Sequence, residues 1–113
     1  MSDKTIELYH CSPLINTAQI LELGLDPWQS KTRWLEIWLV EANLVSWAAR
    51  HVADRHKYHI TDIDLWKAQI DMAWVRNRCG GIYCCRHMIA PERLVHIGPA
   101  FEWINNASNN PQR

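Results

Sequence analysis

The sequence lacks several features that would place it at once in a common class of protein. No apolar run approaches the roughly 20 residues that a membrane-spanning helix needs. Twelve basic and twelve acidic residues give a formal net charge of zero, whereas proteins that hold long nucleic acids cluster Lys and Arg. The sequence contains neither a Gly-x-Gly-x-x-Gly loop nor a P-loop. We therefore expect no membrane contact and no long nucleic-acid partner, although one or two arginines suffice for a small anionic ligand.

The first residues and the cysteines bear on the compartment and on metal binding. Residues 1–5 lack the apolar core of a signal peptide, which predicts a cytoplasmic protein with reduced thiols. Cys79, Cys84, Cys85 and His87 are the candidate zinc ligands. Adjacent residues of a strand point to opposite faces, and tetrahedral zinc needs ligands that converge. The sequence therefore predicts no metal site.

Tryptophan is abundant for a chain of this size. The 113 residues are 48% hydrophobic, which fits one globular domain. Large aromatic side chains usually fill the core of a small domain, but one or two of them can also line a slot that stacks a flat ring. Both interpretations apply to the seven tryptophans, which are Trp28, Trp34, Trp38, Trp47, Trp66, Trp74 and Trp103.

The first half of the chain predicts strand, helix, strand and helix. Apolar and polar residues alternate over 5–10, which indicates a strand. A helix is expected over about 17–23, capped by Asn16 and ended by Gly24, with Pro27 beyond it. Residues 34–40 are nearly all apolar and predict a central strand. A second helix should run from Asn43 to near His56.

The second half predicts mainly strands. Strict alternation favours a strand over about 64–72, and a helix from Thr61 is the competing prediction. Gly80-Gly81 breaks the chain. Further strands are expected over 82–86 and 94–97, and 101–104 would extend the sheet. Residues 1–104 would then form a single α+β domain with much antiparallel pairing, followed by a disordered polar tail over 105–113.

A few polar side chains are candidates for chemistry. His10 follows the first strand, and a neutral imidazole donates one hydrogen bond and accepts another, which suits a ribose. Arg86 ends a short strand and could present a bidentate fork to a phosphate. Glu36, Glu41 and Glu92 are possible carboxylates, but no pair of acids has a spacing that demands acid–base catalysis. Ser12 has no acid and base partner nearby in sequence, so a nucleophilic serine is not supported. Arg33 and Arg93 have weaker claims to a ligand.

The order of these features resembles the ADP-ribosyltransferase-like superfamily. Residues 9–13, Tyr-His-Cys-Ser-Pro, and residues 20–27, Ile-Leu-Glu-Leu-Gly-Leu-Asp-Pro, are similar to the opening motif of that group. Residues 37–39, Ile-Trp-Leu, stand where its second motif has a tyrosine. Residues 81–83, Gly-Ile-Tyr, and 89–94, Ile-Ala-Pro-Glu-Arg-Leu, are similar to its closing motif. The resemblance is greatest to small single-domain members of bacteria and their phages, and extends to RNA 2'-phosphotransferases.

This resemblance, over about residues 6–97, implies an α+β fold with a split β-sheet core and two short helices. NAD or a related nucleotide would bind in a cleft between two small sheets. His10 would contact the ribose of the nicotinamide half, and Trp38, in the place of the usual tyrosine, could stack on a ring. The cofactor contacts that it implies are His10, Cys11, Ser12, Trp38 and Tyr83. The catalytic residues that it implies are His10 and Arg86.

The third motif departs from the family pattern. Transferases that modify proteins carry a glutamate on that strand, whereas this chain has Cys84, Cys85 and Arg86 there. The phosphotransferase branch works with His and Arg instead. Three functions therefore stay open: an NAD-dependent transferase, a binder of NAD or a nucleotide signal, and a domain that acts only through a protein partner. A phage anti-defence protein that sequesters an immune nucleotide is an example of the second. In the third, Trp28, Trp34 and Trp103 would anchor the interface.

Overall fold

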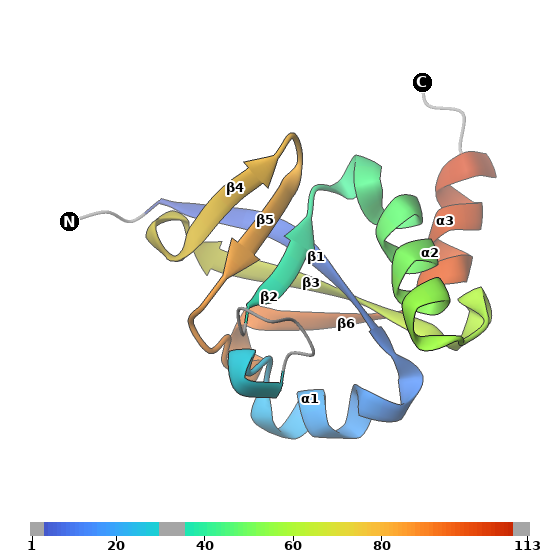
Figure 1. Cartoon of the computed structure of the whole chain (residues 1–113), viewed down its shortest axis with the longest axis horizontal. Coiled ribbons are helices and arrows are strands. Elements are labelled where there is room, and N and C mark those ends of the chain that lie inside the picture. Colours follow the sequence, from blue (N-terminus) through green and yellow to red (C-terminus); the bar gives the residue numbers. More distant parts are fainter. Residues whose placement is uncertain (1–3, 30–35, 110–113) are drawn as a thin grey trace.

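A computed structural model describes residues 4–29 and 36–109 of the chain. Within this part the chain forms six strands and three α-helices, with short 3-10 turns between several of them (Figure 1). In chain order they are β1 Thr5–Pro13, α1 Thr17–Leu23, β2 Ile37–Val40, α2 Val45–His56, β3 Ile63–Asp71, β4 Val75–Cys79, β5 Ile82–Cys85, β6 Leu94–Pro99 and α3 Ala100–Asn109.

The strands form one antiparallel sheet in the order β4-β5-β2-β1-β3-β6. The α+β class and the antiparallel pairing are confirmed. The expected split into two sheets is wrong, because Tyr9 of β1 pairs with Val40 of β2 and joins two three-stranded halves into one sheet. The expectation of two helices is also wrong, since the described residues form three.

The junction between the two halves is narrow. β1 pairs with β3 along its full length, from Thr5 opposite Asp71 to Pro13 opposite Ile63. With β2, in contrast, the registered pair in the described residues is Tyr9–Val40 alone. Beyond this pair the two strands diverge (Figure 1). The divergence leaves space between the last residues of β1 and the first residues of β2.

Two hydrophobic cores lie on the two faces of the sheet, because successive side chains of a strand point to opposite sides. On one face α1 and the residues after it cover Leu8 and Trp66; on the other, α2 and α3 cover Cys11 and Leu65. Small residues let α2 approach the sheet closely, since Ala49 and Ala53 both lie in its buried face. Both cores are built around β1 and β3, which fixes these two strands at the centre of the domain.

The first helix has the predicted bounds, 17–23. Gly24 ends it with φ 82° and ψ −163°, a conformation that only glycine adopts readily. The next residue, Leu25, forms an antiparallel bridge with Ile89 through two backbone hydrogen bonds of 2.9 and 2.8 Å. Asn16 is the N-cap residue of this helix as predicted, but its side chain makes no capping hydrogen bond in the described structure.

Several other boundaries differ from expectation. The predicted strands over 64–72, 82–86 and 94–97 are confirmed as β3, β5 and β6, each within about two residues, and the competing helix from Thr61 is wrong. Residues 101–104 are helical, because Ala100, Trp103 and Ile104 share one face of α3 and pack on the second core. The predicted tail is helical as far as Asn109.

Two predicted segments lie partly outside the described residues. Positions 34–35 of the strand predicted over 34–40 lie outside them, as do residues 110–113 of the predicted tail. The predicted helix from Asn43 is confirmed as α2, which begins at Val45 after a 3-10 turn over Ala42–Leu44. Within the described part, no helix is long and apolar enough to cross a membrane.

Most tryptophans do not fill the core. Among the six that the structure describes, Trp66 alone is fully buried. Trp74 and Trp103 pack against the edges of the two cores, whereas Trp28, Trp38 and Trp47 are exposed. Trp34 lies outside the described residues. An exposed tryptophan offers a ligand or a partner a large aromatic surface, so these three positions are of interest for function.

Candidate functional site

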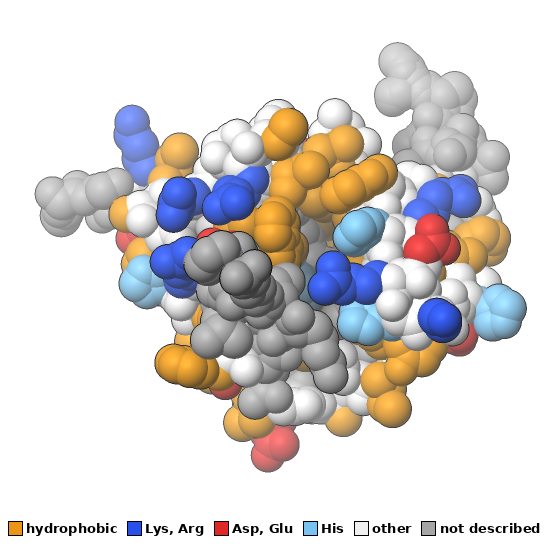
Figure 2. All heavy atoms as spheres, in the orientation of Figure 1, with side chains coloured by type: hydrophobic (Ala, Val, Ile, Leu, Met, Phe, Trp, Pro, Cys, Tyr) orange, Lys and Arg blue, Asp and Glu red, His pale blue; other side chains and the backbone are white. Residues whose placement is uncertain are grey.

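A pocket of about 770 Å³ opens where β1 and β2 diverge. Its walls come from residues 9–13 of β1, from α1 and the turn that follows it, from the start of β2, and from one face of α2. Figure 2 shows this side of the molecule, with hydrophobic side chains at the centre and Lys, Arg and His side chains beside them. The pocket therefore follows from the single-pair junction between the two strands.

His10 connects the diverging strands at the pocket wall. Its Nδ1 lies 2.9 Å from the backbone oxygen of Trp38. A carbonyl oxygen can only accept, so Nδ1 carries the hydrogen and donates. Burial lowers the pKa of His10, and it outweighs the opposing effect of the bond to Trp38. The neutral ring therefore leaves Nε2 as a hydrogen-bond acceptor at the pocket.

The lowered pKa of His10 makes folding stability depend on pH. The unfolded histidine binds a proton below about 6.5, whereas the folded one stays neutral to a lower pH. The free energy of unfolding is therefore highest above pH 6.5. It decreases as the pH falls from 6.5 to the pKa of His10 in the folded protein, because only the unfolded chain binds a proton in this range. We expect the wild type to lose up to about 1.4 kcal/mol per pH unit more than His10→Asn in this interval. Urea denaturation between pH 5 and 8 measures the difference, and parallel curves for the two proteins would contradict it.

Ser12 and Cys11 also line the pocket and differ in what they offer a ligand. The indole Nε1 of Trp66 donates to Ser12 Oγ over 3.0 Å. Because one lone pair of the hydroxyl is used in this way, its own hydrogen is available to donate into the pocket. Burial raises the pKa of the Cys11 thiol to about 12. Cys11 is therefore a neutral, weakly polar part of the wall and not a nucleophile.

Trp38 lies on β2 at the mouth of the pocket with 38% of its surface exposed. The guanidinium carbon of Arg78 is 5.9 Å from the centre of its ring, within the range of a cation–π contact. The side chain of Trp38 thus borders the pocket and is partly accessible.

Arg86 and Tyr83 lie elsewhere. Neither is among the described residues that line the pocket. Arg86 Nε is 3.2 Å from Oε2 of Glu36, a buried carboxylate that does line the pocket. The hydroxyl of Tyr83 donates to Glu41 over 3.2 Å. The guanidinium of Arg86, predicted to bind the ligand, is therefore paired with an acid of the pocket lining.

Among the described residues, the remaining candidates lie outside the lining of this pocket. Arg93 stacks over Trp74 and donates to the backbone oxygen of Gln69, and Glu92 lies in the 3-10 turn over Pro91–Arg93. Arg33 lies outside the described residues. Burial, together with Glu36, raises the pKa of Cys84 to about 12, so this thiol is neutral. In the described part of the chain, no three His, Cys, Asp or Glu side chains converge on a position that could hold a metal ion.

The sequence did not identify one wall of the pocket, formed by α2, as part of a site. Trp47, His51 and Arg55 lie along the exposed side of α2 and all line the pocket. Their spacing of four residues puts them on one face of a helix. The sequence showed this spacing, but not that the face borders a cavity, because that depends on where α2 packs against β1.

Comparison of the chain with protein-family models, with curated proteins and with solved structures finds no match. The resemblance to ADP-ribosyltransferases therefore depends on the sequence motifs. The site residues that it implied stay predictions. The structure brings His10, Cys11, Ser12 and Trp38 together at one pocket, and it places Tyr83 and Arg86 outside the pocket lining.

Proposed function

We propose that this domain binds NAD or a related nucleotide in the pocket between β1 and β2. The observation that carries the proposal is His10, held by Trp38 as a neutral ring with Nε2 as an acceptor. A ribose hydroxyl can donate to this nitrogen. No positive charge on His10 would oppose the cationic nicotinamide ring of NAD.

The other walls suit a nucleotide. A volume of about 770 Å³ lies within the range of roughly 300–1,000 Å³ that is typical of small-molecule sites. The Ser12 hydroxyl can donate to an oxygen of the sugar, and the exposed ring of Trp38 offers a surface on which a base can stack. Apolar side chains such as Ile20 and Val52 line other parts of the walls. This combination of apolar wall and few polar groups is the usual composition of a cofactor site.

The proposal is tested by titrating the protein with NAD, ADP-ribose and a panel of cyclic nucleotides, followed by NMR. We expect at least one of them to bind, and His10→Ala to weaken its affinity roughly tenfold because a buried hydrogen bond is lost. His59→Ala is the matched control, since His59 is exposed and lies outside the pocket. An unchanged spectrum across the whole panel would refute the proposal and favour a protein partner, with the 76% exposed Trp28 as a contact.

Transfer of ADP-ribose is a second candidate, which Glu36 favours. NAD supplies the ADP-ribosyl group in such a reaction, and a carboxylate can stabilise the positive charge that develops on the ribose. Glu36 is 1% exposed and lines the same pocket as His10. It could serve in place of the glutamate that is missing from the third motif. The bond between ribose and nicotinamide breaks, nicotinamide leaves, and water or an added nucleophile accepts the ADP-ribosyl group. Incubation with NAD in water and detection of released nicotinamide distinguishes the two candidates, because a binder releases none.

A further inference from the structure

The face of α2 in the pocket combines an aromatic plane with a positive charge. The rings of Trp47 and His51 stack with centres 5.2 Å apart and planes 14° apart. Arg55 follows one turn later on the same face. Figure 2 shows Lys or Arg and His side chains gathered on this side of the hydrophobic centre. This wall of the pocket thus carries two stacked rings followed by a guanidinium.

Arg55 is the sole Lys or Arg among the described residues that line the pocket. Two acids share the lining, and each has a partner. Asp26 accepts a hydrogen bond from the backbone nitrogen of Trp28 over 3.0 Å, and Glu36 is paired with Arg86. The charge of Arg86 is therefore partly neutralised, whereas no acidic partner of Arg55 is found in the described part of the structure.

We infer that Arg55 binds a phosphate of the nucleotide, so that the α2 wall is the phosphate end of the pocket and the β1–β2 junction is the ribose end. This inference rests on the proposed function. A guanidinium offers two parallel N–H groups to a phosphate and keeps its charge at all relevant pH values. Arg55 on α2 thus takes the phosphate-binding role that the sequence predicted for Arg86.

The test compares phosphate-bearing and phosphate-free probes on two variants of the same helix. Arg55→Gln removes the pocket guanidinium. Arg50→Gln removes a neighbouring one that is exposed, lies outside the pocket lining and is within 3.5 Å of Ser46 Oγ. Affinities for NAD, ADP-ribose, AMP and adenosine are measured by NMR titration. We expect Arg55→Gln to weaken binding of the three phosphate-bearing probes roughly tenfold or more and to leave adenosine unchanged, while Arg50→Gln changes none of them.

The outcomes separate this inference from the proposed function. If neither these probes nor the cyclic nucleotides of the first panel bind the wild type, the proposed function fails and the inference fails with it. If NAD binds and His10→Ala weakens it, but Arg55→Gln leaves the affinity of every probe unchanged, the inference alone is overturned. A tenfold loss for adenosine as well as for AMP would also overturn it, because the guanidinium would then act on the nucleoside. Thermal unfolding of both variants checks that the helix is intact.

Discussion

Replacing Gly24 with alanine should destabilise the domain by about 4 kcal/mol. A Cβ at this position would lie 2.1 Å from the backbone oxygen of Ile89, far closer than two such atoms can approach. The backbone adds a second cost, because φ 82° and ψ −163° fall in a region that other residues rarely enter. The clash cannot be relieved by turning a side chain, since the neighbouring atom belongs to the backbone bridge between Leu25 and Ile89.

Gly80→Ala is the matched control for this prediction. Gly80 also has a positive φ, of 57°, but nothing lies within 4 Å of the position of its Cβ. Alanine there should cost about 1 kcal/mol, from the backbone alone. Urea denaturation gives both free energies of unfolding, and the melting temperature of Gly24→Ala should fall by roughly 15 °C or more. Equal losses for the two variants would show that the contact with Ile89 does not matter.

Gly24 also illustrates which parts of the fold the sequence could predict. Local sequence patterns predict the segment from β1 to α1. These patterns are the alternation of apolar and polar residues in the strand, the apolar face of the helix over 17–23 and the glycine that ends the helix. β4 carries no such signal. Four of its five residues are exposed, so it shows no apolar alternation. It is a strand because the Gly80-Gly81 turn brings it beside β5, and that pairing is a property of the tertiary structure.

The same distinction applies to the site. His10 could be found from the sequence because it lies in the Tyr-His-Cys-Ser-Pro stretch of residues 9–13, but the expectation that it follows the first strand is wrong, since β1 continues past it to Pro13. The pairing of Arg86 with Glu36 could not be predicted, because it depends on which strands are neighbours in the sheet. Ile37 pairs with Cys85, and this register brings Glu36, 50 residues away in sequence, to Arg86. The spacing of four residues between Trp47, His51 and Arg55 is visible in the sequence. That this face of α2 forms a wall of the pocket depends on how β1 and β2 diverge beyond their single registered pair.

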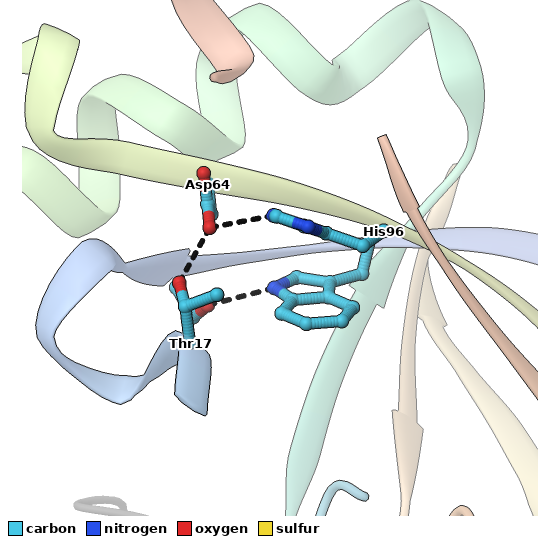
Figure 3. Close-up of polar contacts among 5 residues, drawn as sticks. Thr17, Asp64 and His96 are labelled. Carbon is cyan, nitrogen blue, oxygen red and sulfur yellow. Dashed lines mark hydrogen bonds and ion pairs between the residues drawn. The ribbon is translucent and has the colours of Figure 1, made fainter. Parts of the chain in front are cut away.

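A buried polar cluster holds α1 to the sheet, and removing its centre should cost about 3 kcal/mol. Asp64 is 1% exposed. Its Oδ2 accepts hydrogen bonds from the hydroxyl of Thr17, the first residue of α1, and from Nε2 of His96 on β6 over 2.7 Å (Figure 3). His96 in turn stacks on Trp66, with ring centres 4.5 Å apart, and Trp66 donates to Ser12. One carboxylate thus connects α1, β3 and β6 next to the pocket.

Asp64→Ala leaves the hydroxyl of Thr17 and the imidazole of His96 without their shared acceptor, which is the reason for the large loss. Asp64→Asn keeps the shape and one acceptor oxygen, so it should cost less than half as much. Asp54→Ala is the control, because Asp54 is exposed on α2, and it should change the free energy of unfolding by less than about 0.5 kcal/mol. Chemical denaturation of the three variants measures these values. A loss for Asp64→Ala no larger than that of the control would contradict the prediction.

An Asp–His pair of this kind is also used in acid–base catalysis, and Thr17→Val separates that role from anchoring. The variant keeps the pair between Asp64 and His96 and removes only the tie to α1. If the cluster anchors the helix, stability falls by about 1 kcal/mol and binding of the proposed nucleotide weakens, because α1 forms one wall of the pocket. If the pair served catalysis alone and did not anchor α1, both stability and binding would stay unchanged when the tie is removed. We expect the first result, since neither Asp64 nor His96 is among the described residues that line the pocket.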